Sequence, residues 1–266
     1  MALLTGPAFT GCASWGPTRP QPDLRVSTAE VDQRWRTIGT SVEGRPIRAW
    51  IDGTGPHTTL FVGGVHGDEP SGTDLLESFV VYLEKHPETL QGQRVLIVPA
   101  ANPDGLAAGT RTNAHDIDLN RNFPTANYRR GGRRGSLPAS EPEVRALNRL
   151  IASEKPAFVL AVHAPLGCVD YDGPAADLAE RLSRASGLKL RKIGAQPGSL
   201  GSLTGEDGHI PTVTLELAHQ TPGPYSAWSS LGPALLEALR AGKDYAEHRR
   251  EQPTQSLPEP EPAGAK

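Results

Sequence analysis

Apolar residues along this chain gather in short continuous runs, and longer stretches with apolar residues at helical spacing lie between them. The short runs predict strands at 46–52, 58–62, 94–99, 158–162, 189–193 and 212–217. The longer stretches predict helices at 72–85, 144–152, 175–185 and 229–241. A strand that is apolar throughout is buried on both faces, as in parallel sheets covered by helices. The pattern therefore predicts an α/β fold, a doubly wound, mostly parallel mixed sheet with helices on both faces.

One of these helices has a start signal in the sequence. Ser140 predicts an N-cap, Pro142 falls in the first turn, and Glu143 stands three residues after the cap. The helix at 144–152 is therefore expected to begin directly after Ser140.

The two ends of the chain differ in composition from the part between them. Residues 1–30 are predicted to be a signal-like or lipobox-like segment followed by a Pro-rich tether. Residues 249–266 alternate Pro with Glu and are expected to be disordered. A single domain is predicted at 31–248, and no internal repeat is visible in it.

The N-terminal sequence leaves two interpretations open. Phe9-Thr10-Gly11-Cys12 resembles the lipobox of a bacterial lipoprotein signal, in which the cysteine carries lipid. A positively charged start is missing, however, and the apolar stretch is short and contains Pro7. In one interpretation the true start lies upstream, Cys12 carries a lipid anchor, and the protein is located in the bacterial cell envelope, in the periplasm. In the other the segment is a disordered extension, and the alternative location is the cytoplasm.

Composition and charge exclude several classes of protein. The 266 residues carry a formal net charge of −3, which gives no electrostatic case for a nucleic-acid partner. No apolar run approaches the length of a membrane-spanning helix. The two cysteines, Cys12 and Cys168, are too few for a disulfide framework or a Cys-based zinc site, and Cys168 is expected to be a buried small residue.

Histidines and glutamates stand at the ends of three predicted strands. The run VGGVHGDEPSG places His66 and Glu69 just past one strand, His163 directly follows another, and Glu216 lies near the end of a third. The carboxyl ends of parallel strands form one rim of the sheet, and the reactive crevice of such folds lies there. We therefore expect these four side chains to meet.

The four side chains suit a catalytic zinc site. Two imidazoles and one carboxylate leave a Zn²⁺ ion one open position for water. Zinc polarises a bound carbonyl and lowers the pKa of that water to about 7. A carboxylate that does not bind the metal can then pass the water's proton to the leaving amine, and Glu216 is the free carboxylate of the four. Asp68 is expected to orient His66 from outside the metal shell, or to be a turn residue.

Two arginines follow the predicted strand at 94–99. Arg111 stands in the run RTN, and Arg121 stands in DLNRNF at 118–123. A guanidinium binds a carboxylate through two parallel hydrogen bonds and can also face a developing oxyanion. Together on the rim of the sheet, the two arginines would supply both functions.

These residues, in this order, resemble the zinc carboxypeptidases. The motifs that carry the resemblance are HGDE at 66–69, DLNRNF at 118–123, a histidine at a strand end and TLEL at 214–217, and it covers roughly 38–240. It implies a zinc-carboxypeptidase-like fold and a hydrolase with one zinc ion.

The resemblance also implies a role for each matching residue. His66, Glu69 and His163 would bind the zinc, Glu216 would be the general base, and Arg111 would polarise the scissile carbonyl. Asn120 and Arg121 would bind the terminal carboxylate of the substrate.

Within that family, the short length and the stretch CVDYDGPA at 168–175 are most similar to bacterial murein peptide amidases. Those enzymes cleave the bond between γ-D-glutamate and meso-diaminopimelate, so a murein stem peptide is the expected substrate. The run PGSLGSLTGEDG resembles their substrate loop, with Leu203 near the pocket for the residue after the scissile bond. The family's tyrosine on the preceding loop is missing here, where 194–198 is GAQPG.

Two other functions fit parts of the pattern. N-acyl amino-acid deacylases, such as aspartoacylase and succinylglutamate desuccinylase, use much the same ligand pattern on single acylated amino acids. An inactive peptide-binding module is the third hypothesis, against which the intact set of metal-site and arginine residues argues. Asp170 is left open between a residue that shapes the substrate pocket and an ordinary loop acid.

Overall fold

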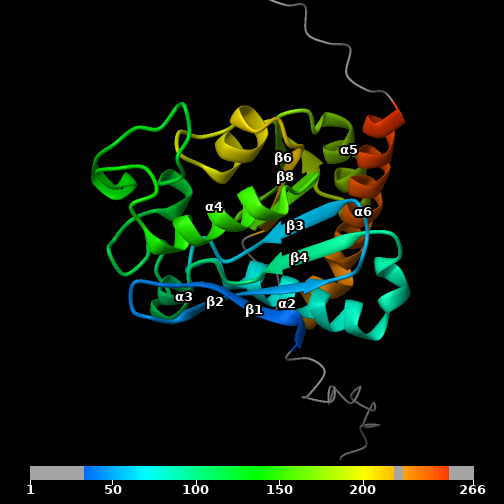
Figure 1. Ribbon diagram of the computed structural model, residues 1–266, viewed down its shortest axis with the longest axis horizontal. Coiled ribbons are helices and arrows are strands. Elements are labelled where there is room, and N and C mark those ends of the chain that lie inside the picture. Colours follow the sequence, from blue (N-terminus) through cyan, green and yellow to red (C-terminus); the bar gives the residue numbers. More distant parts are fainter. Residues whose placement is uncertain (1–32, 219–223, 252–266) are drawn as a thin grey trace, which may run out of the picture.

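The computed structural model describes residues 33–218 and 224–251, which form one eight-stranded mixed sheet with helices on both faces (Figure 1). The strands are β1 (Trp35–Thr40), β2 (Pro46–Asp52), β3 (Thr58–Val62), β4 (Arg94–Val98), β5 (Phe158–His163), β6 (Leu166–Asp172), β7 (Lys189–Leu190) and β8 (Thr212–Ala218). The α-helices are α2 (Pro70–Lys85), α3 (Pro103–Ala108), α4 (Pro142–Glu154), α5 (Ala176–Ser186) and α6 (Pro224–Glu251). Cys12 and its lipobox-like segment lie outside the described residues, so the lipid anchor stays a prediction. Of the tail predicted at 249–266, residues 249–251 belong to α6, and 252–266 lie outside the described residues.

Parallel strands occupy the centre of the sheet. The strand order is β1-β2-β4-β3-β5-β8-β6-β7, and β4, β3, β5 and β8 run parallel to one another. On either side of this group, β2 and β6 pair with it antiparallel. The predicted mixed, mostly parallel α/β sheet is confirmed, and the carboxyl ends of its central strands share one edge.

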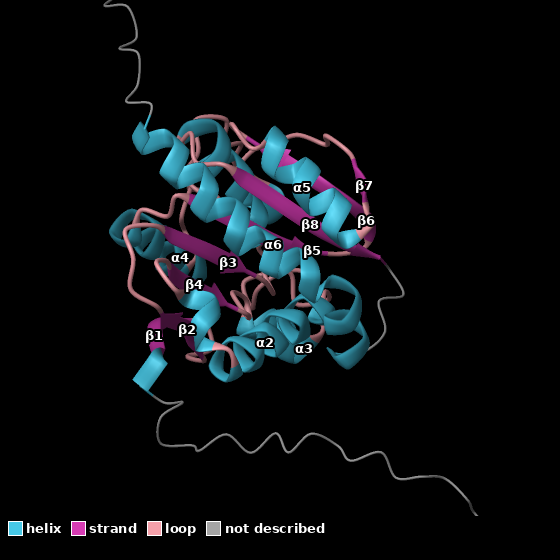
Figure 2. Ribbon diagram, turned by 90° about the vertical axis from the view of Figure 1, so that its right-hand side faces the viewer, coloured by secondary structure: helices cyan, strands magenta, loops and turns pink. Residues whose placement is uncertain are grey.

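The helices form one layer on each face of the sheet. Helices α2, α5 and α6 pack on one face, and α4 packs on the other (Figure 2). None of the helices in the described ranges is long and apolar enough to cross a membrane.

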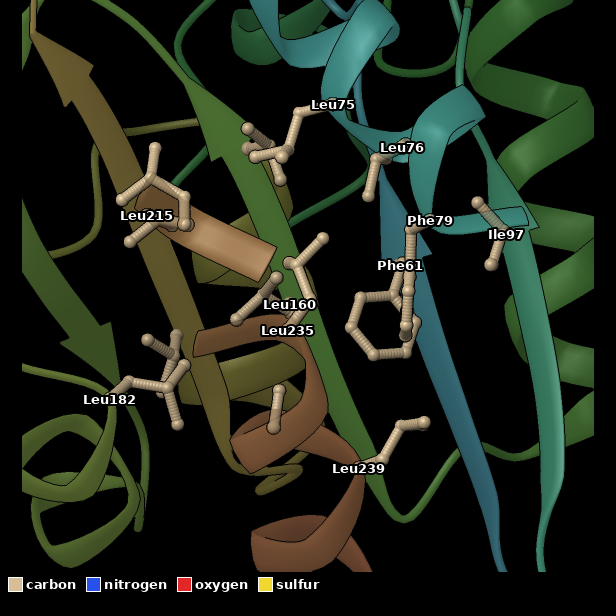
Figure 3. Close-up of a cluster of buried hydrophobic side chains, with 14 of the residues drawn as sticks. Phe61, Leu75, Leu76, Phe79, Ile97, Leu160, Leu182, Leu215, Leu235 and Leu239 are labelled. Atoms are coloured by element: carbon tan, nitrogen blue, oxygen red, sulfur yellow. The ribbon is translucent and has the colours of Figure 1, made fainter. Parts of the chain in front are cut away.

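The central strands bury side chains on both faces, which explains their continuous apolar runs. In β3, Phe61 points into the layer of α2 and α6, and Leu60 points to the opposite face. The Phe61 and Phe79 rings meet edge to face with their centroids 5.1 Å apart. Figure 3 shows this layer, in which Leu75, Leu76 and Phe79 of α2 and Leu235 and Leu239 of α6 cover Phe61, Leu160 and Leu215. Packing on both faces fixes the strand ends that carry the candidate site.

The structure confirms most predicted elements and adds two strands. The predicted bounds of β2 and β3 are those observed, and β4, β5 and β8 differ from prediction by one residue at an end. Strands β1 and β6 were not predicted. Strand β1 has only exposed and partly exposed positions, and β6 combines polar residues with Gly167, so neither has a continuous apolar run.

Two local predictions are wrong. Helix α4 begins at Pro142 with Glu141 at its N-cap, and the Ser140 hydroxyl donates to the Glu141 carboxylate instead of capping the helix. Of the strand predicted at 189–193, only Lys189–Leu190 forms. The amides of Ile193 and Gly194 donate to a carboxylate oxygen of Asp170, at 2.7 and 3.5 Å, instead of to a neighbouring strand.

Candidate functional site

The four predicted side chains meet at the carboxyl edge of the central strands. His66 and Glu69 lie in the turn between β3 and α2, His163 is the last residue of β5, and Glu216 lies in β8. His163 and Glu216 are direct partners in the β5–β8 register. All four line one cavity of about 290 Å³, as the strand-end argument predicts.

The turn that carries His66 and Glu69 is held against the end of β4. Gly63 donates to the Val98 carbonyl, and the amide of Asn102 donates to Gly64. At Gly67 the turn runs so close to the backbone of α3 that an added Cβ would lie 1.8 Å from the carbonyl carbon of Gly105. Glycine between the two polar residues is therefore a steric requirement of this turn.

Both imidazoles face the Glu69 carboxylate. His66 Nδ1 lies 2.8 Å from Glu69 Oε1, and His163 Nδ1 lies 3.0 Å from Glu69 Oε2. All three side chains are buried, and their ligand atoms lie within 4.8 Å of one another. Two imidazole nitrogens and one carboxylate, converging from buried side chains, are the donor set of a catalytic zinc ion, so these residues fit zinc.

The electrostatics of this group keep Glu69 ionised. Burial opposes ionisation of Glu69, but hydrogen bonds with His163 and His66 outweigh it and hold the pKa of Glu69 well below its usual range. Burial also opposes a charge on His66, but its contacts with Asp118 and Glu69 raise the pKa of this imidazole. A proton and a metal ion therefore compete for the same His66 nitrogen.

Asp118 is the carboxylate that orients His66. Its Oδ1 lies 3.1 Å from His66 Nε2, the nitrogen on the far side from Glu69. The expected orienting residue, Asp68, is exposed, so that interpretation is wrong. Burial opposes ionisation of Asp118, but the contact with His66 and the charges of Arg111 and Arg121 lower its pKa to about 2. A carboxylate behind a ligating histidine fixes the ring's tautomer and orientation.

Arg111 connects the two carboxylates of this group. Its Nε lies 3.2 Å from Asp118 Oδ2, and one terminal nitrogen lies 3.3 Å from Glu69 Oε1. The side chain is 41% exposed and lines the cavity, so its guanidinium borders the space that a substrate would enter.

Asn120 and Arg121 line the same cavity from the segment after Asp118. The Asn120 side-chain oxygen accepts a hydrogen bond of 2.9 Å from the Leu200 amide, and Arg121 donates to the Asn120 carbonyl at 2.7 Å. Burial, together with the nearby charges of Arg111 and Arg134, lowers the pKa of Arg121 against the pull of Asp118. A half-buried guanidinium surrounded by other cations is suited to an anionic ligand.

Glu216 lies in the cavity outside the group of three candidate ligands. Its Oε2 accepts a hydrogen bond of 3.4 Å from the Leu166 amide. Burial raises its pKa, and the charge of Glu69 adds to the increase, whereas His163 and His66 act in the opposite direction. A carboxylate in this position, outside the group of three candidate ligands, can serve as a proton acceptor and donor.

Residues of β6 and of the segment 193–201 also line the cavity. Asp170 is buried, lines the cavity and accepts the Ile193 and Gly194 amides, which places it in the pocket wall rather than in an ordinary loop. Leu203 is not among the described residues that line the cavity, and it packs partly buried against the core under α4. Leu200 of the same segment lines the cavity, and a role of Leu203 near the pocket stays a prediction. Cys168 is buried, as predicted.

Asp172 is a buried acid on that wall that the sequence analysis missed. Its residue is 3% exposed, and its Oδ1 atom has no hydrogen-bond partner among the described residues. Burial raises its pKa to about 6, and the charges of Asp170 and Glu206 add to this, while Lys192 acts against it. The signal for both missed acids was present, because Asp118 and Asp172 stand inside the runs DLNRNF and CVDYDGPA.

Comparison with known proteins agrees with this geometry. The family model described as zinc carboxypeptidase matches residues 30–169, which include all three candidate ligands but not Glu216. Murein peptide amidase A of Escherichia coli K12 is 35% identical over 184 residues, covering 62% of this chain and 73% of that protein.

Two solved structures share the fold. The murein-tripeptide amidase of Escherichia coli O157 has a TM-score of 0.60 at 29% identity, covering 78% of this chain and 91% of that one. Bovine thrombin-activatable fibrinolysis inhibitor, solved with tick carboxypeptidase inhibitor, has a TM-score of 0.68 over 80% and 90% of the two chains. At 18% identity this second likeness concerns the fold alone.

In the ligand-free protein, Asp172→Asn is expected to raise the free energy of unfolding above about pH 6. The folded protein raises the pKa of Asp172 from 3.8 to about 6, so it binds a proton more tightly than the unfolded chain does. Protonated Asp172 therefore adds to the free energy of unfolding below about pH 4. This contribution is lost as the pH rises through about 6, and the loss is on the order of 2 to 3 kcal/mol. Urea unfolding at a series of pH values measures it, with Glu247→Gln, a change at an exposed acid on α6, as the control. A stability difference between variant and parent that does not change with pH would contradict this assignment.

Proposed function

The chain belongs to the zinc carboxypeptidase family, and on this premise we propose that it hydrolyses an amide bond next to a free carboxylate in murein stem peptides. The bond would be the one between γ-D-glutamate and meso-diaminopimelate. Family membership makes the chain a zinc-dependent hydrolase. The proposal concerns the substrate and the role of each residue.

One observation carries the proposal. A single cavity contains the His66–Glu69–His163 group, the free carboxylate of Glu216 and the guanidinium of Arg121. Hydrolysis needs the first two, and a substrate that ends in a carboxylate needs the third. Their presence on one wall of one cavity favours cleavage close to a carboxyl terminus.

His66, Glu69 and His163 would hold the zinc ion, with Asp118 fixing the orientation of His66. When bound, the zinc polarises the scissile carbonyl and lowers the pKa of a water molecule. The three ligands come from the ends of two parallel strands that are packed on both faces, so the site keeps its shape with little reorganisation.

Glu216 would move the proton. Its carboxylate accepts a proton from the attacking water and delivers it to the leaving nitrogen, which departs as an amine. Burial raises the pKa of Glu216, which is the direction that favours a carboxylate that accepts a proton. The hydrogen bond from the Leu166 amide leaves the other carboxylate oxygen, Oε1, to face the water.

The two arginines would bind the two negative charges of the reacting substrate. Arg111 borders the cavity beside Glu69, where it can donate to the oxygen of the scissile carbonyl as charge develops on it. Arg121, with the Asn120 side chain beside it, would bind the terminal carboxylate. That contact would place the last amide bond of the peptide over the site.

The choice of murein peptides rests on similarity to named relatives. A murein peptide amidase and a murein-tripeptide amidase are similar to this chain over most of their own length. A stem peptide carries several carboxylates, which suits a cavity with two arginines on its rim.

We also propose that the protein is located in the cell envelope, with a lipid on Cys12. Fractionation of cells that express the parent or a Cys12→Ala variant would separate this from a cytoplasmic location.

Loss of one proposed ligand should remove the metal. His163→Ala takes away one of the two imidazoles, and we expect its zinc content to fall sharply below the one ion per chain expected of the parent. Metal analysis of the purified proteins measures this. His86→Ala, which changes a half-exposed histidine paired with Glu88, serves as the control and should keep its zinc. Full zinc in His163→Ala would overturn the ligand assignment.

The parent enzyme should release meso-diaminopimelate from L-Ala-γ-D-Glu-meso-diaminopimelate, and Glu216→Gln should release almost none. The amide cannot accept a proton, so a loss of roughly 100-fold or more in kcat is expected while zinc is retained. Mass spectrometry identifies the products, and Glu247→Gln, an exposed change on α6, is the matched control. Turnover of Glu216→Gln within a few-fold of the parent would require another base.

Arg121→Lys should weaken recognition of the terminal carboxylate, because lysine keeps the charge but loses the paired N–H donors. With the tripeptide, kcat/KM should fall by an amount that corresponds to a loss of roughly 2 to 5 kcal/mol in transition-state stabilisation. The same peptide with that carboxylate amidated should be poor for the parent and barely worse for the variant. Arg129→Lys changes an exposed arginine and is the control. Equal discrimination between acid and amide by parent and variant would show that Arg121 does not bind the carboxylate.

A further inference from the structure

We propose that Asn113 strengthens zinc binding by positioning Asp118 behind His66. Two buried carboxylates at the start of α4, those of Glu141 and Glu143, hold Asn113 in place. Asn113 is not among the described residues that line the cavity, so it is a positioning residue that acts through Asp118. The inference rests on the metal site of the proposed function and not on its substrate.

Asp118 reaches His66 from a segment that lies partly at the surface. Residues 109–118 follow α3, and 114–116 in this segment are exposed. The 3.1 Å contact with His66 Nε2 nevertheless requires the Asp118 carboxylate to stay within hydrogen-bond distance of one nitrogen atom. Burial alone does not fix an exposed turn. The position of Asp118 therefore depends on hydrogen bonds within this segment and to its neighbours.

The Asn113 side chain closes the turn that precedes Asp118. The amides of His115 and Ile117 both donate to its side-chain oxygen, each at 3.1 Å. The backbone amide of Asn113 donates to the Ile117 carbonyl at 3.0 Å. Arg111 stands two residues before this turn and Asp118 directly after it, so the turn sets the spacing of the two side chains that contact the metal site.

The same side chain is held from the other side by α4. Asn113 Nδ2 donates to Glu141 Oε2 at 2.8 Å and to Glu143 Oε2 at 3.2 Å. With two bonds donated and two accepted, the amide group makes every hydrogen bond available to it. Asn113 is 4% exposed and Glu143 is 0% exposed. Hydrogen bonds between buried polar groups are costly to leave unmade, so the orientation of Asn113 is fixed.

Both acids belong to the rigid part of the fold. Glu143 lies in the first turn of α4, and Glu141 directly precedes this helix. Glu143 Oε1 accepts the Val42 amide at 3.2 Å, from the turn between β1 and β2. Val144, the next residue of the helix, is fully buried in the core on that face of the sheet. Asn113 therefore ties the turn at 113–117 to a helix that is packed on the sheet.

The charges of the two acids fit this role. Burial opposes ionisation of Glu141, but its hydrogen bonds, the one with Asn113 foremost, outweigh it and lower its pKa. Burial raises the pKa of Glu143, and the charge of Glu141 adds to the increase, while hydrogen bonds that include the one from Asn113 act against it. Without the Asn113 amide, two buried acids would face each other with no donor between them.

A second metal ion does not fit between these acids. Among the residues that the structure describes, the His66–Glu69–His163 group is the one in which three possible ligands converge. The Asn113 amide stands between the two carboxylates of α4 and presents its hydrogen atoms to both, whereas a cation would need an oxygen atom there. The two acids therefore serve the turn.

The zinc affinities of four proteins test the proposal: the parent, Asn113→Ala, Asp118→Ala and the variant with both changes. Competition with a chromophoric chelator for Zn²⁺ at fixed pH measures them. Each single change should lower the affinity roughly 10- to 100-fold, the range for loss of a partner behind a metal ligand. Because Asn113 acts through Asp118, the double variant should bind zinc within about threefold of Asp118→Ala. Losses that multiply in the double variant, or full affinity in Asn113→Ala, would overturn the proposal.

Glu141 gives a milder form of the same test, which applies if Asn113→Ala does not fold. Its side chain caps no backbone amide of α4, so Glu141→Ala removes one acceptor of Asn113 without removing a helix cap. The zinc affinity should fall several-fold, but not when Asp118 is already alanine. Glu141→Gln should restore it, because its amide oxygen can still accept from Asn113. Parent-like zinc affinity in Glu141→Ala would contradict the proposal.

Glu154→Gln is the matched control, because Glu154 lies at the other end of α4 in a partly buried ion pair with Arg94. It should leave the zinc affinity unchanged. A loss of affinity in Glu154→Gln as large as that in Glu141→Ala would show a general effect of destabilising α4, and the assignment to Asn113 would fail.

The zinc measurement distinguishes this inference from the proposed function, because it requires no turnover. If the murein tripeptide is not cleaved but the affinity losses do not add, the proposed substrate fails and the role of Asn113 stands. If the tripeptide is cleaved but the losses of Asn113→Ala and Asp118→Ala multiply, the role of Asn113 fails and the proposed function stands.

Discussion

The candidate site depends on one buried carboxylate. Glu69 faces His66 through one oxygen and His163 and the Ala164 amide through the other, and Arg111 lies beside it. A buried carboxylate is stable only with such partners, so the end of β3, the start of α2 and the end of β5 must stay together. The same contacts direct both Nδ1 atoms toward one point. Fold stability and metal-ligand geometry are therefore satisfied by the same interactions.

The hydrolytic end of the site could be predicted because it follows from burial. Strands packed on both faces must be apolar throughout, so the first polar residue after each run marks a strand end, and the parallel arrangement brings these ends together. His66, Glu69 and His163 were located in this way. Glu216 was located because β8 ends at the same edge, where its register with His163 places the two side by side.

The rest of the cavity could not be predicted, because it depends on the paths of loops and on an irregular strand. From the sequence, either Asp68 or Asp118 could orient His66. The path of residues 109–118 brings Asp118 to the imidazole ring, and this path cannot be predicted from the sequence pattern. Leu200 rather than Leu203 lines the cavity because 202–207 forms a π-helix that turns Leu203 toward the core. Strand β6 has mixed polarity, so the alternation that sets Asp170 and Asp172 on one face is visible only once the strand is known.

The residues that could be predicted from the sequence and those that could not belong to different parts of the cavity. The metal-binding end is built on rigid strand ends, where a displacement of one ångström would be costly for hydrolysis. The rest of the cavity lining includes β6, which pairs with β8, and 193–201, where Asp170 accepts hydrogen bonds from the Ile193 and Gly194 amides. In the scheme proposed for this chain, Arg121 binds the departing residue through its carboxylate, and the fixed hydrolytic residues act on the bond between that residue and the rest of the peptide.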